Sequence, residues 1–113
     1  MFASLTECHF SDVLKAFNEG FSDYLVPVNM TKEQLRQKIE REKLDVNHSF
    51  AYLVDGNIAG VILTGISEFH GVKQMWIGGM AVVPAYRSKG IAKKMLQQVE
   101  AEARVKKLFR NIA

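Results

Sequence analysis

The segment Met80–Leu96 constrains the fold most, because it joins an apolar strand to an amphipathic helix through a short basic turn. Pro84 ends the strand, since proline has no N–H to donate to a sheet ladder. The helix is predicted to begin near Ser88 or Lys89, and the missing side chain of Gly90 lets a ligand approach the backbone. Unpaired N–H groups and partial positive charge at a helix start favour an anion such as phosphate. The spacing alone leaves an ordinary solvated turn as the alternative.

Composition predicts one ordered globular domain, because 48% of the 113 residues are apolar and 24% are charged. A net charge of +3 without an aromatic–basic pattern argues against a nucleic-acid partner. The single cysteine allows no internal disulfide and fits a reducing compartment. Because no apolar leader or long apolar run is seen, we expect a cytoplasmic protein that does not enter a membrane. The three histidines lack the spacing of a metal site, so no metal is predicted.

Hydrophobic periodicity and turn residues predict the order strand, helix, helix, strand, strand, strand, helix. This order favours an α/β (α+β) fold, with a mixed sheet covered by helices. The predicted segments are a strand at Phe2–Leu5, a helix at Asp12–Glu19 capped by Ser11, a helix from a Thr31/Gln34 capping box to Lys43, strands at Phe50–Val54 and Ile58–Ile66 around Asp55-Gly56, a loop at Ser67–Lys73, a strand at Met75–Val83 with a bulge at Gly78-Gly79, and a helix at Ser88–Lys106.

The turn after the last long strand resembles the signature of the GNAT acetyltransferase superfamily. That signature is Arg or Gln, two residues, Gly, one residue, then Gly or Ala, after a strand ending in Val-x-Pro-x-Tyr-Arg; here it reads Val82–Ala92. The resemblance implies that backbone amides of the turn hold the pyrophosphate of acetyl-coenzyme A and that the strand lies along its pantetheine arm. The implied cofactor-binding residues are Met80, Ala81, Val82, Arg87, Ser88, Lys89, Gly90, Ile91 and Ala92.

By the same resemblance, residues 1–113 are expected to form a single GNAT-like domain that is incomplete at its C-terminus. Its sheet would be mixed and largely antiparallel, flanked by helices, and truncated after the helix that follows the fourth strand. Residues 105–113 fit either the start of a fifth strand or a basic tail. A fourth strand with a free edge invites pairing with another chain, so a homodimer or larger homo-oligomer is expected.

The resemblance implies an acetyl-coenzyme A-dependent N-acetyltransferase in which a small-molecule or peptide amine attacks the thioester directly. Segment 75–83 contains no Asp or Glu to act as base. The candidate bases are Glu68 and His70 in the preceding loop, and the candidate acids are Tyr24 and Tyr86, of which Tyr86 fits a packing role better. The alternative is a truncated, catalytically inactive GNAT-like module that binds coenzyme A or self-associates.

Overall fold

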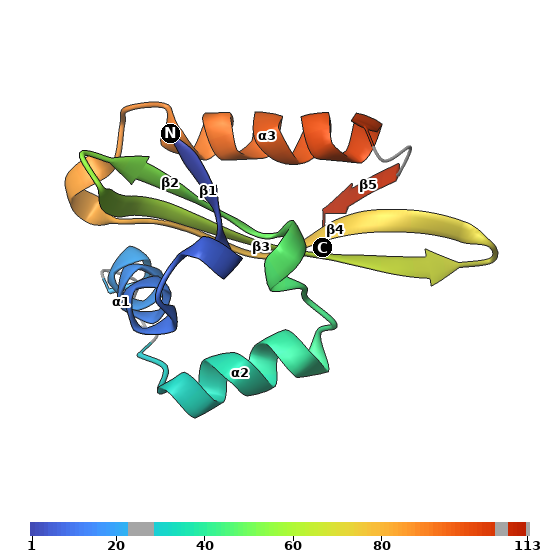
Figure 1. Ribbon diagram of the computed structural model, residues 1–113, viewed down its shortest axis with the longest axis horizontal. Helices are drawn as coiled ribbons and strands as arrows, with labels where there is room; N and C mark the ends of the chain where they lie inside the picture. Colours follow the sequence, from blue (N-terminus) through green and yellow to red (C-terminus); the bar gives the residue numbers. More distant parts are fainter. Residues whose placement is uncertain (23–28, 106–108, 113) are drawn as a thin grey trace.

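A five-stranded sheet lies between two helices on one face and a third helix on the other (Figure 1). This computed structural model describes residues 1–22, 29–105 and 109–112. In chain order the elements are β1 (Phe2–Ser4), η1 (Leu5–Glu7), α1 (Phe10–Gly20), α2 (Lys32–Arg41), η2 (Val46–His48), β2 (Phe50–Val54), β3 (Asn57–Phe69), β4 (Val72–Val82), η3 (Pro84–Tyr86), α3 (Ile91–Val105) and β5 (Phe109–Ile112). None of the helices in the described part of the chain is long and apolar enough to cross a membrane.

The strands follow one another in the order β1-β2-β3-β4-β5. The first three pairings are antiparallel, whereas β5 lies parallel to β4, so the predicted mixed and largely antiparallel sheet is confirmed. A parallel neighbour needs a crossover connection, and α3 supplies it. The fold therefore continues one strand beyond α3, and the expected truncation directly after that helix is wrong.

Two buried clusters fill the two sides of the sheet. Phe17 of α1 and Leu35 of α2 pack with Leu63 on one face, while Met95 and Val99 of α3 pack with sheet residues on the other. The last helix buries an apolar stripe on the sheet: Ile91, Met95, Val99 and Ala103 are at most 4% exposed. α1 and α3 thus hold their places by burying an apolar stripe on the sheet, whereas α2 buries Leu35 alone.

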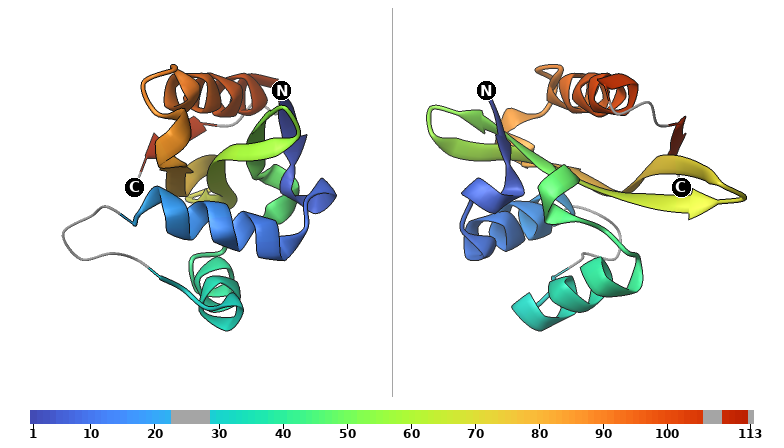
Figure 2. Two further views of the ribbon diagram at one scale, coloured as in Figure 1. Left: turned by 90° about the vertical axis from the view of Figure 1, so that its left-hand side faces the viewer. Right: turned by 45° about the vertical axis from the view of Figure 1, so that its right-hand side comes forward.

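Both long hairpins turn through two residues with positive φ, which matches the right-handed twist of the strands. Asp55 and Gly56 have φ of +51° and +81°, as their sequence predicts. His70 and Gly71 have φ of +51° and +76° and make an equally tight turn, so the predicted loop at Ser67–Lys73 is wrong. The sequence did not predict this turn, because its first residue is His70, whereas Asn, Asp or Gly is usual at that position. Figure 2 shows the resulting β3–β4 arm projecting past the helices.

Helix starts follow local backbone geometry more closely than they follow cap-like residues. The Thr31/Gln34 capping box of α2 is confirmed, with reciprocal bonds of 3.2 and 2.9 Å. By contrast, α1 begins at Phe10 after His9, so Ser11 is inside the helix and is not its cap. The last helix begins at Ile91 rather than near Ser88, because Ser88 and Gly90 have φ of +63° and +75°, outside the helical region.

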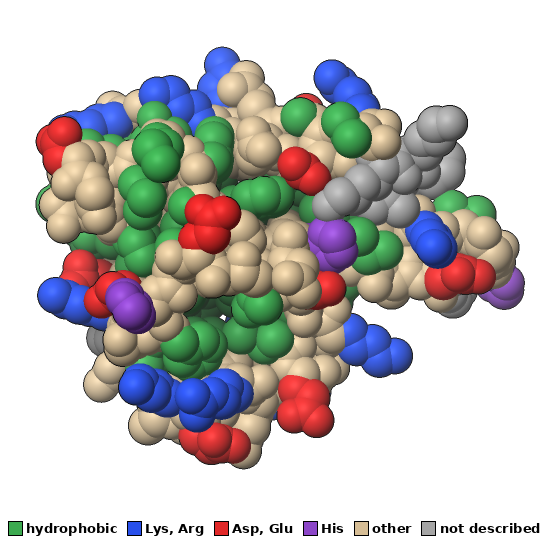
Figure 3. Space-filling model, viewed as in Figure 1, with side chains coloured by type: hydrophobic (Ala, Val, Ile, Leu, Met, Phe, Trp, Pro, Cys, Tyr) green, Lys and Arg blue, Asp and Glu red, His purple; other side chains and the backbone are tan. Residues whose placement is uncertain are grey.

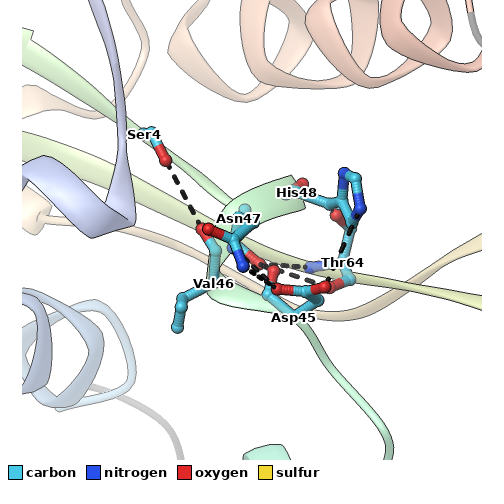
Figure 4. Close-up of polar contacts among 7 residues, drawn as sticks. Ser4, Asp45, Val46, Asn47, His48 and Thr64 are labelled. Atoms are coloured by element: carbon cyan, nitrogen blue, oxygen red, sulfur yellow. Dashed lines mark hydrogen bonds and ion pairs between the residues drawn. The ribbon is translucent and has the colours of Figure 1, made fainter.

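A bulge in β4 sits beside a buried polar cluster that anchors η2. The register jumps because Leu63 pairs with Gly79 while Thr64 pairs with Ile77, which leaves Gly78 as the extra residue. The cluster, defined here as Asp45, His48, Ser49 and Thr64, is drawn in Figure 4. Ser49 Oγ accepts a hydrogen bond from Thr64 N–H at 3.0 Å and donates one to the Asp45 carbonyl at 2.7 Å. Asp45 N–H in turn donates to the Thr64 carbonyl at 2.8 Å, and Thr64 Oγ1 donates to the His48 carbonyl.

Glycine lets the end of α1 approach β4 closely. Gly20 is buried at the last position of α1, and a Cβ there would lie 2.5 Å from the Cβ of Ala81. One turn earlier, Phe17 packs on Gly79, where a Cβ would lie 3.2 Å from the ring atom Cε2. The position of α1 on the sheet therefore depends on the absence of side chains at these contacts.

We expect Gly20→Ala to lower the free energy of unfolding by about 1–3 kcal/mol, because the new methyl group overlaps Ala81. Urea denaturation measures the loss. In an Ala81→Gly background the same substitution should cost less than half as much, because the overlapping methyl group is gone. Equal losses in the two backgrounds would show that the contact does not limit the approach of α1.

Candidate functional site

The C-terminal half of β4 has one open edge. The pairing with β5 covers Gln74–Ile77, whereas within the described ranges the segment Gly78–Val82 has a strand neighbour only on the β3 side. The open segment begins at Gly78, the extra residue of the bulge in β4. An edge of this kind offers unpaired N–H and C=O groups to a strand-like ligand.

Main-chain direction decides which residues serve the open edge. Val83 N–H donates to the Ala59 carbonyl at 2.9 Å, so Val83 and, by alternation, Ala81 point toward β3. The main-chain groups of Met80 and Val82 therefore point to the open edge. The main-chain groups of Ala81, the third strand residue predicted to contact an arm-like ligand, point toward β3.

The turn after β4 exposes a run of backbone donors. Tyr86 N–H donates to the Val83 carbonyl at 2.9 Å, and the first helical bond of α3 runs from Lys94 N–H to the Gly90 carbonyl at 3.0 Å. Between them, no main-chain carbonyl of the described residues accepts a bond from the N–H groups of residues 88–93. Ser88, Lys89 and Gly90 are exposed. This run of amides at the start of a 15-residue helix is suited to an anion.

The side chain of Arg87 binds the protein's own backbone. Its Nη2 donates to the Gly20 carbonyl at 2.7 Å, and its Nε donates to the Val82 carbonyl at 3.3 Å. A guanidinium group at a helix C-terminus is favourable, because it satisfies an end carbonyl and complements the helix dipole. Arg87 thus joins α1 to the end of β4, a role that motif spacing does not reveal. An anion at this turn would therefore be bound chiefly by the main-chain amides that follow Arg87.

Two lysines near the turn contact tyrosine side chains. Lys89 Nζ lies 5.9 Å from the ring centre of Tyr86, and Lys94 Nζ lies 3.2 Å from the hydroxyl of Tyr52. Tyr86 is half-buried and packs against both core clusters, in agreement with a packing role. Ile91, the first residue of α3, is 3% exposed, so only its main chain is available to a ligand.

The structure does not bring the candidate bases to the open edge. Glu68 pairs with Lys73 near the tip of the β3–β4 arm, and His70 is in its turn. Lys73 is five residues from the bulge at Gly78, which is about 16 Å along a strand. Both candidate bases are exposed there. Tyr24 lies outside the described residues.

Two hollows are lined in part by residues of α1. A groove of about 300 Å³ between α1 and the β2–β3 turn is lined by polar side chains that include Asp12 and Glu19. Figure 3 shows a second, apolar hollow, which lies between the start of α1 and α2 and is lined in part by Cys8. Burial, with smaller contributions from Glu7 and Asp12, raises the pKa of the Cys8 thiol. Cys8 is therefore held in the unreactive thiol form. Among the described residues, no three His, Cys, Asp or Glu side chains gather as metal ligands would.

Comparison with known proteins gives a consistent picture. A sequence profile described as "Acetyltransferase (GNAT) family" matches residues 10–112. No curated protein matches the sequence. One similar solved structure is an aminoglycoside 6'-N-acetyltransferase from Acinetobacter haemolyticus, with 16% identity, a TM-score of 0.70, and coverage of 100% of this chain and 78% of that one. A GNAT family acetyltransferase from Brucella melitensis in complex with acetyl-CoA has 17% identity, a TM-score of 0.71, and coverage of 92% and 68%. Glucosamine-6-phosphate N-acetyltransferase from Arabidopsis thaliana has 17% identity, a TM-score of 0.67, and coverage of 100% and 80%. At these identities the likeness concerns the fold.

We expect Arg87→Ala to lower the free energy of unfolding by about 1–3 kcal/mol, because two backbone carbonyls lose a charged donor. The free energy of unfolding of Arg87→Lys should lie between those of the parent protein and Arg87→Ala, since an ammonium group cannot span both carbonyls as the guanidinium does. Urea denaturation is the measurement, and exposed Lys93 supplies the control, because Lys93→Ala should stay within about 0.5 kcal/mol of the parent. An Arg87→Ala protein as stable as the parent would contradict the joining role.

Proposed function

The chain belongs to the GNAT acetyltransferase family, and we propose that it is an acetyl-coenzyme A-dependent N-acetyltransferase. The open edge of β4 beside a run of unpaired amides is the observation that carries this proposal. A solved structure of similar fold holds acetyl-CoA, which supports the same cosubstrate here. Because the protein carries a single cysteine, a reducing compartment suits it, and we place its activity in the cytoplasm.

In the proposed complex, the pyrophosphate lies on the amides of the turn and the pantetheine arm runs along the edge. The turn contributes the main chain of Ser88–Ala92, with Lys89 adding charge, and the edge contributes Met80 and Val82. The arm then delivers its thioester to the level of Gly78, the bulge residue that has no partner in β3. An unpaired donor at a bulge can stabilise the charge that grows on the thioester oxygen.

The proposed reaction needs no covalent enzyme intermediate. The nitrogen of a neutral amine forms a bond to the acetyl carbonyl carbon, the carbon–sulfur bond breaks, and the amine's proton balances the one taken up by the thiolate. We assign no base on segment 75–83, since it has no Asp or Glu. Tyr24 stays a candidate acid. The acceptor class is a small-molecule or peptide amine.

A second function has one observation in its favour. Glu68 and His70 lie at the tip of the β3–β4 arm, so neither of these candidate bases lies at the open edge. This favours a module that binds coenzyme A without catalysis. Turnover against a panel of amines separates the two functions: thiol release that depends on an amine supports the transferase, and binding without release supports the module.

We also propose that the chain self-associates through a sheet edge. The outer edge of β1 and the open edge of β4 have no strand neighbour among the described residues. Sedimentation at micromolar concentration should show a dimer or larger species. A monomer under those conditions would contradict the proposal.

The amide cradle can be tested by a matched pair of substitutions at Gly90, whose φ is +75° and whose Cβ would touch nothing within 4 Å. Asn and Asp are similar in size and tolerate positive φ better than most residues. Calorimetry should show acetyl-coenzyme A binding to Gly90→Asn, and binding at least about tenfold weaker to Gly90→Asp, because a carboxylate repels the diphosphate. The difference should shrink in about 1 M salt. No heat with the parent protein at millimolar ligand would remove the proposed function.

A further inference from the structure

We infer that Leu44 and Phe17 set the size of the acyl group that the open edge accepts, so that acetyl fits and butanoyl is excluded. The inference rests on the proposed function, because it takes the arm to run from the turn along Val82 and Met80 toward the bulge. It goes beyond that function, because it concerns the apolar wall, formed by Leu44 and Phe17, that the terminal acyl group meets.

That wall is revealed by two adjacent glycines. A Cβ at Gly78 would lie 2.4 Å from Cδ2 of Leu44, and a Cβ at Gly79 would lie 3.2 Å from Cε2 of Phe17. Both side chains therefore pack directly on the main chain of the bulge, on the face covered by α1 and α2. The two glycines are nevertheless half-buried rather than buried. The bulge is thus a narrow accessible strip with apolar side chains along one side.

The wall is held from several directions. Leu44 is 7% exposed, and its N–H donates to the Ile39 carbonyl at the end of α2 at 2.8 Å. The next residue, Asp45, belongs to the buried polar cluster that is fixed to Thr64 (Figure 4). Phe17 is 3% exposed, and its ring centre lies 5.0 Å from that of Phe21. Side chains held this firmly cannot move aside for a longer acyl group without loss of packing.

The strip also ends close to the bulge. β5 begins to cover β4 at the pair Ile77–Ile112, one residue before Gly78. An arm that follows the edge from Val82 travels about 13 Å to reach Gly78. Extra methylene groups beyond a thioester at that point would extend toward β5 or against Leu44 and Phe17. The geometry favours a two-carbon acyl group.

The test compares the affinities of coenzyme A, acetyl-coenzyme A and butanoyl-coenzyme A by calorimetry. The parent protein should bind the acetyl form at least about tenfold more tightly than the butanoyl form, which is the range expected for forced overpacking. In Leu44→Ala the ratio should fall to about threefold or less, because the lost side chain leaves room for two methylene groups. Phe17→Leu provides a second, milder opening if Leu44→Ala does not fold.

Leu35→Ala is the matched control. Leu35 is fully buried on α2 in the same apolar cluster, and it is not among the atoms nearest to the bulge glycines. Its removal creates a comparable cavity but should keep the parent's acyl preference. Equal binding of acetyl and butanoyl forms by the parent, or an unchanged ratio in both wall variants, overturns the inference while coenzyme A binding still stands. If none of the three ligands binds, the proposed function fails and takes this inference with it.

Discussion

Phe17 and Leu44 rest on the main chain of Gly79 and Gly78, where β4 carries one residue more than its partner β3. Much of the remaining architecture depends on this contact. Because no side chain intervenes, α1 and the end of α2 reach the sheet and bury the apolar cluster on that face. The same bulge residue, Gly78, directly follows the part of β4 that pairs with β5, which is Gln74–Ile77. The contact of the helices with the sheet and the start of the open edge therefore lie at the same place in β4.

The candidate site consists largely of main-chain groups that secondary structure leaves unpaired. At the edge these are the N–H and C=O groups of Met80 and the N–H group of Val82, and at the turn they are the amides before the first helical bond of α3. Unpaired backbone groups are stable only where water or a ligand can reach them, so such a site must lie on the surface. It also places few demands on side chains. This is why a short basic turn in the sequence is enough to predict such a site.

Side-chain roles were harder to predict than main-chain roles. Arg87 stands at the first position of the motif, yet its guanidinium group binds the carbonyls of Gly20 and Val82. The partner at Gly20 is 67 residues away, and spacing within a motif carries no information about it. Glu68 was predicted to lie in a loop near the site, but the tight turn at His70-Gly71 carries it to the tip of a hairpin. Leu44 left no sequence signal at all, because an isolated leucine after a helix is compatible with any buried position.

The sequence by itself determined the order and type of the elements from β1 to α3, the capping box of α2, the Asp55-Gly56 turn and the presence of a turn between β4 and α3. These features depend on residues that are neighbours in the chain, where periodicity and turn chemistry act. Tertiary structure decided the start of α3, the partial pairing of β5, the position of Arg87 and the wall over the bulge. Each of these depends on which distant segments meet, and burial and close packing settle that only once the whole chain has folded.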